Sequence, residues 1–130
     1  MNTEGQPEVQ YYPVETTRTL PFSAAVRVDK MLYLSGQIGI DDRGNVVSGG
    51  IAAETRQAMQ NIQATLERYG SSLDRVVKVT VMLADMAEWM EMNKVYVSYF
   101  PKHLPARSSM GTTGLALGAR VEIECIAVLD

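Results

Sequence analysis

The chain has 130 residues, of which 46% are hydrophobic and 21% charged, and its net charge is −3. These values are typical of one globular domain. The lysines and arginines are scattered along the sequence, which argues against a nucleic-acid backbone as partner, because such binding relies on clustered cations. The sequence also has no apolar run near the ~20 residues of a membrane span, and no signal-peptide pattern at its start.

The first 19 residues are polar and show little periodicity. Residues 1–19 are therefore expected to form a loose N-terminal arm or an early edge strand. No internal repeat or linker divides the rest of the chain, so residues 20–130 are predicted to form a single domain.

Two short apolar runs follow, at residues 24–28 and 31–37, with only Asp29 and Lys30 between them. Two such runs joined by two residues are typical of a tight β-hairpin. Residues 41–45 read Asp-Asp-Arg-Gly-Asn, which predicts a turn between two short extended pieces.

The first helix is predicted over residues 51–69, where apolar side chains recur at a helical spacing. Gly70 follows directly and suits the left-handed conformation that often ends a helix. Residues 76–83 are β-branched and apolar on both faces, which predicts a strand that needs cover on both sides.

A second helix is predicted behind Asp85 and Glu88, which have the spacing of a capping box. Apolar residues recur at a helical spacing over residues 86–100. Pro101 ends the pattern, because proline cannot continue a helix.

The chain closes with an extended stretch at residues 107–113, a bend at 115–118 and a strand at 120–129. The order of strands, helix, strand, helix and strands predicts an α+β fold, a mixed sheet with two helices on one face. Two helices cover only one face of such a sheet. The apolar residues on the second face therefore predict an obligate oligomer.

Arg107 is a candidate ligand-binding residue. It lies between Pro105 and a run of small residues at 108–114. The planar guanidinium matches a carboxylate or phosphate with two hydrogen bonds. The alternative is a structural ion pair at a strand edge.

Glu122 and Glu124 share one face of the last strand with apolar residues. Partial burial would raise the pKa of such a carboxyl group and prepare it to handle protons or orient a water molecule. The alternatives are an ion pair with Arg120 or Arg107, or plain solvation, because structural networks also perturb pKa values.

His103 is the only histidine and Cys125 the only cysteine. A single histidine without a nearby cysteine or carboxylate cluster predicts no metal site of the usual kind. Cys125 alternates toward the helices and is expected to be a buried small hydrophobe rather than a nucleophile. One thiol allows no intrachain disulfide and fits a reducing compartment, here predicted to be the cytoplasm.

Six short motifs resemble, in order and spacing, those of the Rid/YjgF family, the reactive intermediate deaminases. They span about residues 20–128, and the last two are the most specific. In this sequence they are Ser35-Gly36-Gln37-Ile38, Thr55-Arg56-Gln57-Ala58, Val77-Lys78-Val79-Thr80-Val81, Asn93 with Tyr96 and Phe100, Pro105-Ala106-Arg107-Ser108, and Val121-Glu122-Ile123-Glu124. The resemblance implies a chorismate-mutase-like fold and a homotrimer, with the sheets around a central barrel and ligands in clefts between subunits.

The best-known activity of that family is hydrolysis of reactive enamines and imines, such as 2-aminoacrylate, to 2-keto acids and ammonia, as in 2-iminobutanoate/2-iminopropanoate deaminases. By resemblance, Arg107 grips the substrate carboxylate and Glu122 positions the attacking water. Ser35, Gly36 and Asn93 line the ligand-binding site by the same resemblance. No cofactor is implied, because an imine is already electrophilic and mainly needs orientation and a placed water.

Several residues depart from the family pattern within the implied substrate site. Phe22 stands where the deaminases carry a tyrosine, whose phenol can hydrogen-bond near the ligand. Ser109 stands where many members have cysteine, but its backbone N–H survives that change. Gly111, Gly114 and Ala116 replace bulkier residues or proline, which suggests a roomier or different cleft.

The sequence leaves three functions open: an imine deaminase, a non-catalytic trimer that binds small carboxylates, and a ribonuclease or translation inhibitor, as claimed for some relatives. Phe22 slightly favours the second. The net charge and the lone His103 argue against the third. The expected partners are a small carboxylate and further copies of the chain, with neither nucleic acid nor membrane.

Overall fold

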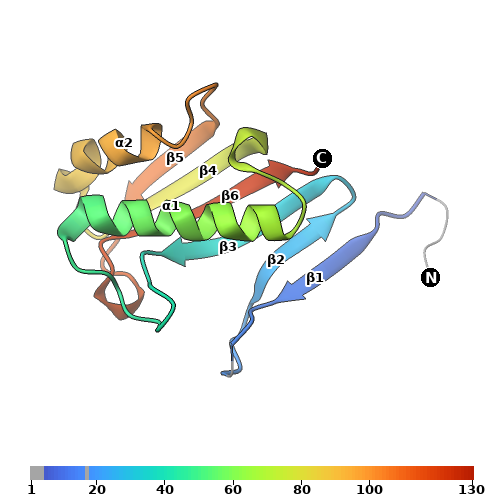
Figure 1. Ribbon diagram of the computed structural model, residues 1–130, viewed down its shortest axis with the longest axis horizontal. Coiled ribbons are helices and arrows are strands. Elements are labelled where there is room, and N and C mark those ends of the chain that lie inside the picture. Colours follow the sequence, from blue (N-terminus) through green and yellow to red (C-terminus); the bar gives the residue numbers. More distant parts are fainter. Residues whose placement is uncertain (1–4, 17) are drawn as a thin grey trace.

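A computed structural model describes residues 5–16 and 18–130. Within them, six strands form one sheet in the order β1-β2-β3-β6-β4-β5, and α1 and α2 lie on one of its faces (Figure 1). The strands are β1 (Val9–Pro13), β2 (Ser23–Val28), β3 (Met31–Ile38), β4 (Val76–Leu83), β5 (Ala106–Gly111) and β6 (Val121–Val128). The helices are α1 (Gly50–Arg68) and α2 (Trp89–Val97), with 3₁₀ turns η1 (Leu73–Arg75), η2 (Met86–Glu88) and η3 (Ala116–Gly118). Only β4 and β5 pair in parallel, so the predicted α+β fold, a mixed sheet with two helices on one face, is confirmed.

Local sequence signals account for several of the connections. The β2–β3 hairpin turns at Asp29, whose φ is 50°. In the predicted turn at residues 41–45, the Asp41 carboxylate accepts hydrogen bonds from the backbone N–H groups of Arg43 and Asn45. Gly70 follows α1 with a φ of 90°, the left-handed conformation that its position predicted.

The capping box predicted before the second helix is half right. The Asp85 carboxylate accepts a hydrogen bond from the Ala87 N–H at 2.9 Å. Glu88 does not reach back to Asp85, because its carboxylate pairs with Arg120 Nη1 at 2.9 Å. In this pair both partners are charged, whereas in the cap only the carboxylate would be. The helix begins with the 3₁₀ turn η2.

The structure decides between the two alternatives for the N-terminal residues and corrects one boundary near the end of the chain. Within the first 19 residues, β1 pairs with β2 along the sheet edge, so the edge-strand alternative holds for Val9–Pro13. The extended stretch expected at residues 107–113 ends as β5 at Gly111, and Thr112 donates its N–H to the Leu83 carbonyl.

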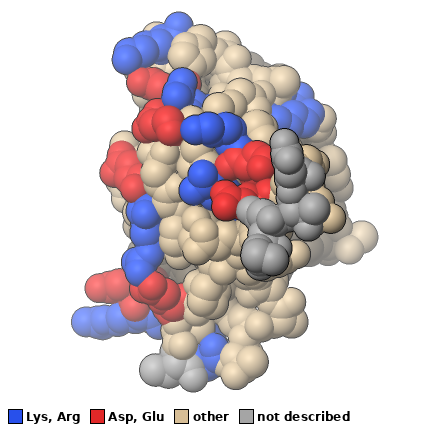
Figure 2. Space-filling model, turned by 90° about the vertical axis from the view of Figure 1, so that its right-hand side faces the viewer, with Lys and Arg blue, Asp and Glu red and all other residues tan. Residues whose placement is uncertain are grey.

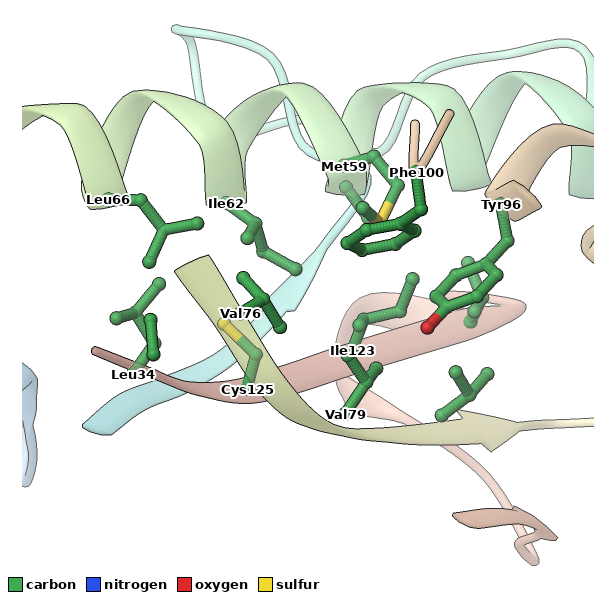
Figure 3. Close-up of a cluster of buried hydrophobic side chains, with 14 of the residues drawn as sticks. Leu34, Met59, Ile62, Leu66, Val76, Val79, Tyr96, Phe100, Ile123 and Cys125 are labelled. Atoms are coloured by element: carbon green, nitrogen blue, oxygen red, sulfur yellow. The ribbon is translucent and has the colours of Figure 1, made fainter. Parts of the chain in front are cut away.

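The hydrophobic core lies between the two helices and the sheet (Figure 3). Apolar side chains from α1 and α2 pack onto the buried faces of β4 and β6. The opposite face of the sheet has no helix over it, and there Tyr33 and Met110 remain 42% and 44% exposed. In the described chain, β4 is therefore covered on one face only. No helix in this part of the chain is long and apolar enough to cross a membrane.

Candidate active site

Arg107 lies on the edge strand β5, with its side chain turned toward α2. Its guanidinium carbon is 4.8 Å from the centre of the Tyr96 ring and 5.8 Å from that of Trp89. Within residues 5–16 and 18–130, no carboxylate lies within ion-pair distance of Arg107. The guanidinium is therefore held by aromatic faces, which leave its planar donor fork available for an anion.

A cavity of about 280 Å³ opens beside Arg107. It is lined by Asn93, Tyr96, Val97, Leu104, Pro105 and Arg107. Asn93 Oδ1 and the Tyr96 hydroxyl are buried without a hydrogen-bond partner among the described residues, and the same holds for Ser109 Oγ, two residues along β5 from Arg107. Burial raises the pKa of Tyr96 to about 12, against the opposing effect of the Arg107 charge, so its phenol stays protonated.

A second cavity, of about 290 Å³, adjoins the Glu122 carboxylate. Its walls come from β2, β3, β6, η3 and the connection between β1 and β2. They comprise Val14, Leu20, Phe22, Ala24, Ser35, Gly36, Gln37, Ile38, Ile40, Ala116 and Glu122. Four predicted site residues therefore meet here: Phe22, Ser35, Gly36 and Glu122. The Ser35 hydroxyl donates to the Ser23 carbonyl at 2.6 Å, which ties β3 to β2 at this point.

Glu122 rests on the backbone of Gly36. The β3–β6 register shifts between Leu34 and Gln37, and a Cβ at Gly36 would lie 3.0 Å from Glu122 Cδ. Burial raises the pKa of Glu122, and the negative charge of Glu124 raises it further.

The ion pairs considered for Glu122 are not formed by the described residues. Arg120 pairs instead with Glu88 at 2.9 Å and, more loosely, with Glu54 at 3.7 Å. With no cation beside it, the Glu122 carboxyl group keeps the raised pKa that suits a group receiving a proton.

The two cavities lie on opposite faces of the sheet. Arg107 is aligned with Val79, which is buried beneath the helices. Glu122 is aligned with Met82, three residues further along β4, and side chains alternate between faces along a strand. Because β4 lies between β5 and β6, two interstrand spacings separate Arg107 from Glu122, which amounts to about 10 Å perpendicular to the strands. A single described chain does not bring Arg107 and Glu122 into one pocket.

The family described as Endoribonuclease L-PSP matches residues 15–129. The chain belongs to this family, Rid/YjgF. A mouse protein named 2-iminobutanoate/2-iminopropanoate deaminase is 45% identical over 109 residues, which make up 83% of this chain and 81% of the mouse protein. The crystal structure of the yeast protein YEO7 is similar with a TM-score of 0.89 and 39% identity, and covers 95% of this chain and 100% of its own. RidA from the Antarctic bacterium Psychrobacter has a TM-score of 0.82 and 33% identity, over 92% and 94% of the two chains.

The remaining titratable candidates of this Rid/YjgF chain lie outside both cavities named above. His103 is exposed, and its Nε2 lies 2.7 Å from the Asp74 carbonyl oxygen. Cys125 is buried as predicted, and burial together with Glu124 raises its pKa to about 12, which leaves the thiol protonated and unreactive. Among the described residues, no group of three His, Cys, Asp or Glu side chains could hold a metal ion.

Several residues of these cavities escaped sequence reasoning. The sequence assigns Trp89 to a helix and Tyr96 to a helix and a family motif, without a role at the site for either, yet both flank Arg107. Tyr96 is one helical turn from Asn93, and this i, i+3 spacing was the available signal. Val14 and Leu20 carried no signal, since they join the second cavity only when the connection between β1 and β2 folds over β3.

Proposed function

We propose that this Rid/YjgF chain hydrolyses 2-imino acids to 2-keto acids and ammonia. The observation that carries the proposal is the Arg107 guanidinium, stacked on Tyr96 with no carboxylate partner among the described residues. A donor fork held in this way is suited to the carboxylate of a small acid. The mouse relative carries the name of such a deaminase.

The proposed chemistry needs one water molecule and no cofactor. Water adds to the imine carbon while Glu122 orients it and accepts one of its protons. The proton held by Glu122 passes to the nitrogen as the carbon–nitrogen double bond becomes a single bond, which gives a carbinolamine. Glu122 then takes the hydroxyl proton of the carbinolamine and delivers it to the nitrogen, which leaves as ammonia while the hydroxyl oxygen forms the keto group. The raised pKa of Glu122 favours the uptake of each proton from water or hydroxyl, because the protonated carboxyl group is then less costly.

A homotrimer completes the proposed site. Because Arg107 and Glu122 face opposite sides of one sheet, the Arg107 cavity of one subunit would adjoin the Glu122 cavity of the next. Tyr33 and Met110 on the uncovered sheet face support such an assembly, since exposed apolar surface favours association. The sheets would then surround a central barrel, and Asn93 and Ser109 would reach the ligand from the Arg107 side.

A second candidate function is a non-catalytic trimer that binds small carboxylates. Phe22 favours it, because this ring at the rim of the Glu122 cavity has no hydroxyl to bond a ligand or a water. A ribonuclease has less support, although the family description carries that word. On the face drawn in Figure 2, lysine and arginine side chains are interspersed with acidic ones rather than gathered into a patch.

A cytoplasmic location is also part of the proposal. It rests on the single cysteine, Cys125, which is buried and free and therefore fits a reducing compartment.

Imine hydrolysis measured on wild type and Arg107→Ala tests the proposal. An amino-acid oxidase would generate 2-iminopropanoate and 2-iminobutanoate, and released keto acid would be followed against spontaneous hydrolysis. We expect acceleration by the wild type and a loss of about 100-fold or more in kcat/KM for Arg107→Ala, because a charged two-point contact is removed. Light scattering should show trimers for both proteins. Equal rates for the two would overturn the role of Arg107, while tight keto-acid binding without turnover would support the carboxylate-binding alternative.

A further inference from the structure

The second cavity has a composition unlike that of a site for a very small polar substrate. Its volume is about 290 Å³, near the lower limit for pockets that enclose a whole small ligand. Most of its wall is aliphatic or aromatic, from Val14, Leu20, Phe22, Ile38, Ile40 and Ala116. Glu122 is its only ionisable lining residue within the described chain.

We infer that this cavity receives the side chain of the imino acid, and that preferred substrates carry an extended aliphatic side chain rather than a single methyl group. The inference rests on the proposed function and specifies its substrate class. The carboxylate, the nitrogen and the side chain all leave the substrate near one carbon atom. With the carboxylate at Arg107 and a water on Glu122, the apolar walls beside Glu122 are the surface left for the side chain.

The size of the cavity separates short side chains from long ones. The methyl group of 2-iminopropanoate would leave most of the 290 Å³ to water. Each further methylene removed from water strengthens binding about fourfold. Phe22 is 52% exposed at the rim, so a longer side chain would also cover this ring.

Charge excludes other side chains. An acidic side chain would face the Glu122 carboxylate, and the cavity lining among the described residues offers no cation to pair with it. A buried charge without a partner is strongly disfavoured. The cavity therefore selects uncharged aliphatic imino acids.

Ala116 gives a way to fill the cavity without disturbing the core. It lies in η3, is exposed to solvent and contributes its small side chain to the wall. Ala116→Leu adds three carbon atoms there. Ala64→Leu is the matched control, because Ala64 is an exposed residue of α1 outside this cavity.

The test compares imines generated in place from alanine, 2-aminobutyrate, norvaline and leucine, with wild type, Arg107→Ala, Ala116→Leu and Ala64→Leu. For the wild type we expect kcat/KM to rise about fourfold for each carbon from alanine to norvaline. Ala116→Leu should lower kcat/KM for the norvaline and leucine imines at least tenfold more than for the alanine imine. Ala64→Leu should behave like the wild type.

The outcomes separate this inference from the proposed function. Hydrolysis that depends on Arg107 but is flat or falling with side-chain length would overturn the inference and leave the deaminase standing. No acceleration of any imine would overturn both. Inhibition of the wild type by the matching 2-keto acids gives a check without a variant at Ala116. The inhibition constants should fall along the same series, and a flat series would again overturn the inference.

Discussion

The carboxyl group of Glu122 occupies the space that a side chain on Gly36 would need. A Cβ at residue 36 would lie 3.0 Å from Glu122 Cδ and closer still to Oε2. A real Cβ does not lie so close to another side chain. The position of the Glu122 side chain therefore depends on glycine at residue 36. The motif Ser35-Gly36-Gln37 thus shapes the site because Gly36 has no side chain, which leaves room for the Glu122 carboxyl group.

Gly36→Ala should impair turnover more than folding. The added Cβ would clash with the end of the flexible Glu122 side chain, which can move away at little cost to the stability of the fold. The water molecule that Glu122 orients would then be displaced as well. We expect kcat to fall about 10- to 100-fold, since a displacement of about 1 Å can cost that much, while the melting temperature changes by a few degrees. Ala64→Leu is the control, because Ala64 is an exposed residue of α1 outside both cavities. A Gly36→Ala protein with wild-type kcat would contradict the role assigned to Glu122.

Tyr96 should affect substrate binding through Arg107. Tyr96→Leu removes the ring face beneath the guanidinium and should raise KM about 2- to 30-fold, the range of a cation–π contact of about 0.5–2 kcal/mol. Tyr96→Phe keeps the ring and should stay within about twofold of the wild-type KM. Phe100→Leu controls for lost packing, since Phe100 is a buried aromatic residue 5.0 Å from Tyr96. If Phe100→Leu raised KM as much as Tyr96→Leu, the effect would belong to the core.

Glu124→Gln should shift the acidic limb of the pH profile to lower pH. Glu122 accepts a proton from water only when ionised, so kcat/KM falls as the pH drops through its pKa. Burial raises this pKa first and the charge of Glu124 raises it further. Removing the Glu124 charge lowers the pKa of Glu122 and therefore moves the acidic limb of the profile to lower pH. Profiles of kcat/KM against pH for Glu124→Gln, with exposed Glu67→Gln as control, measure the shift. A limb that stays in place or moves up would contradict the assignment.

Arg120 should stabilise the fold by neutralising a buried carboxylate. The Glu54 side chain is 6% exposed and accepts the Arg120 backbone N–H at 2.8 Å, with the Arg120 guanidinium beside it. Arg120→Met keeps the N–H but leaves the Glu54 charge without a cation, which should cost about 2 kcal/mol in the free energy of unfolding.

Arg75→Met is the matched comparison, because the Arg75–Asp130 pair is exposed and worth about 1 kcal/mol or less. Urea unfolding at one fixed protein concentration measures both variants, since an oligomer's stability depends on concentration. Equal losses of unfolding free energy in the two arginine variants would show that the Arg120 guanidinium does not stabilise the buried Glu54 carboxylate.

Much of this protein could be predicted from short-range sequence pattern. The alternation along β6 identified Cys125 as buried and placed Glu122 on the opposite face of the strand, because strand side chains alternate. Gly70 marked the end of α1 and the composition of residues 41–45 marked a turn, because these signals act within a few residues. The motif around Arg107 pointed to the residue whose guanidinium the structure leaves without a carboxylate partner among the described residues.

Only the tertiary structure decided how these residues are arranged relative to one another. Alternation sets the two faces within a strand, but the strand order β3-β6-β4-β5 and its register decide that Arg107 and Glu122 face opposite sides. The contact of Glu122 with Gly36, the stacking of Arg107 on Tyr96 and the pairing of Glu88 with Arg120 likewise join segments far apart or on separate elements. Such contacts form only when packing brings residues from distant segments together. The periodicity within one segment therefore cannot predict them.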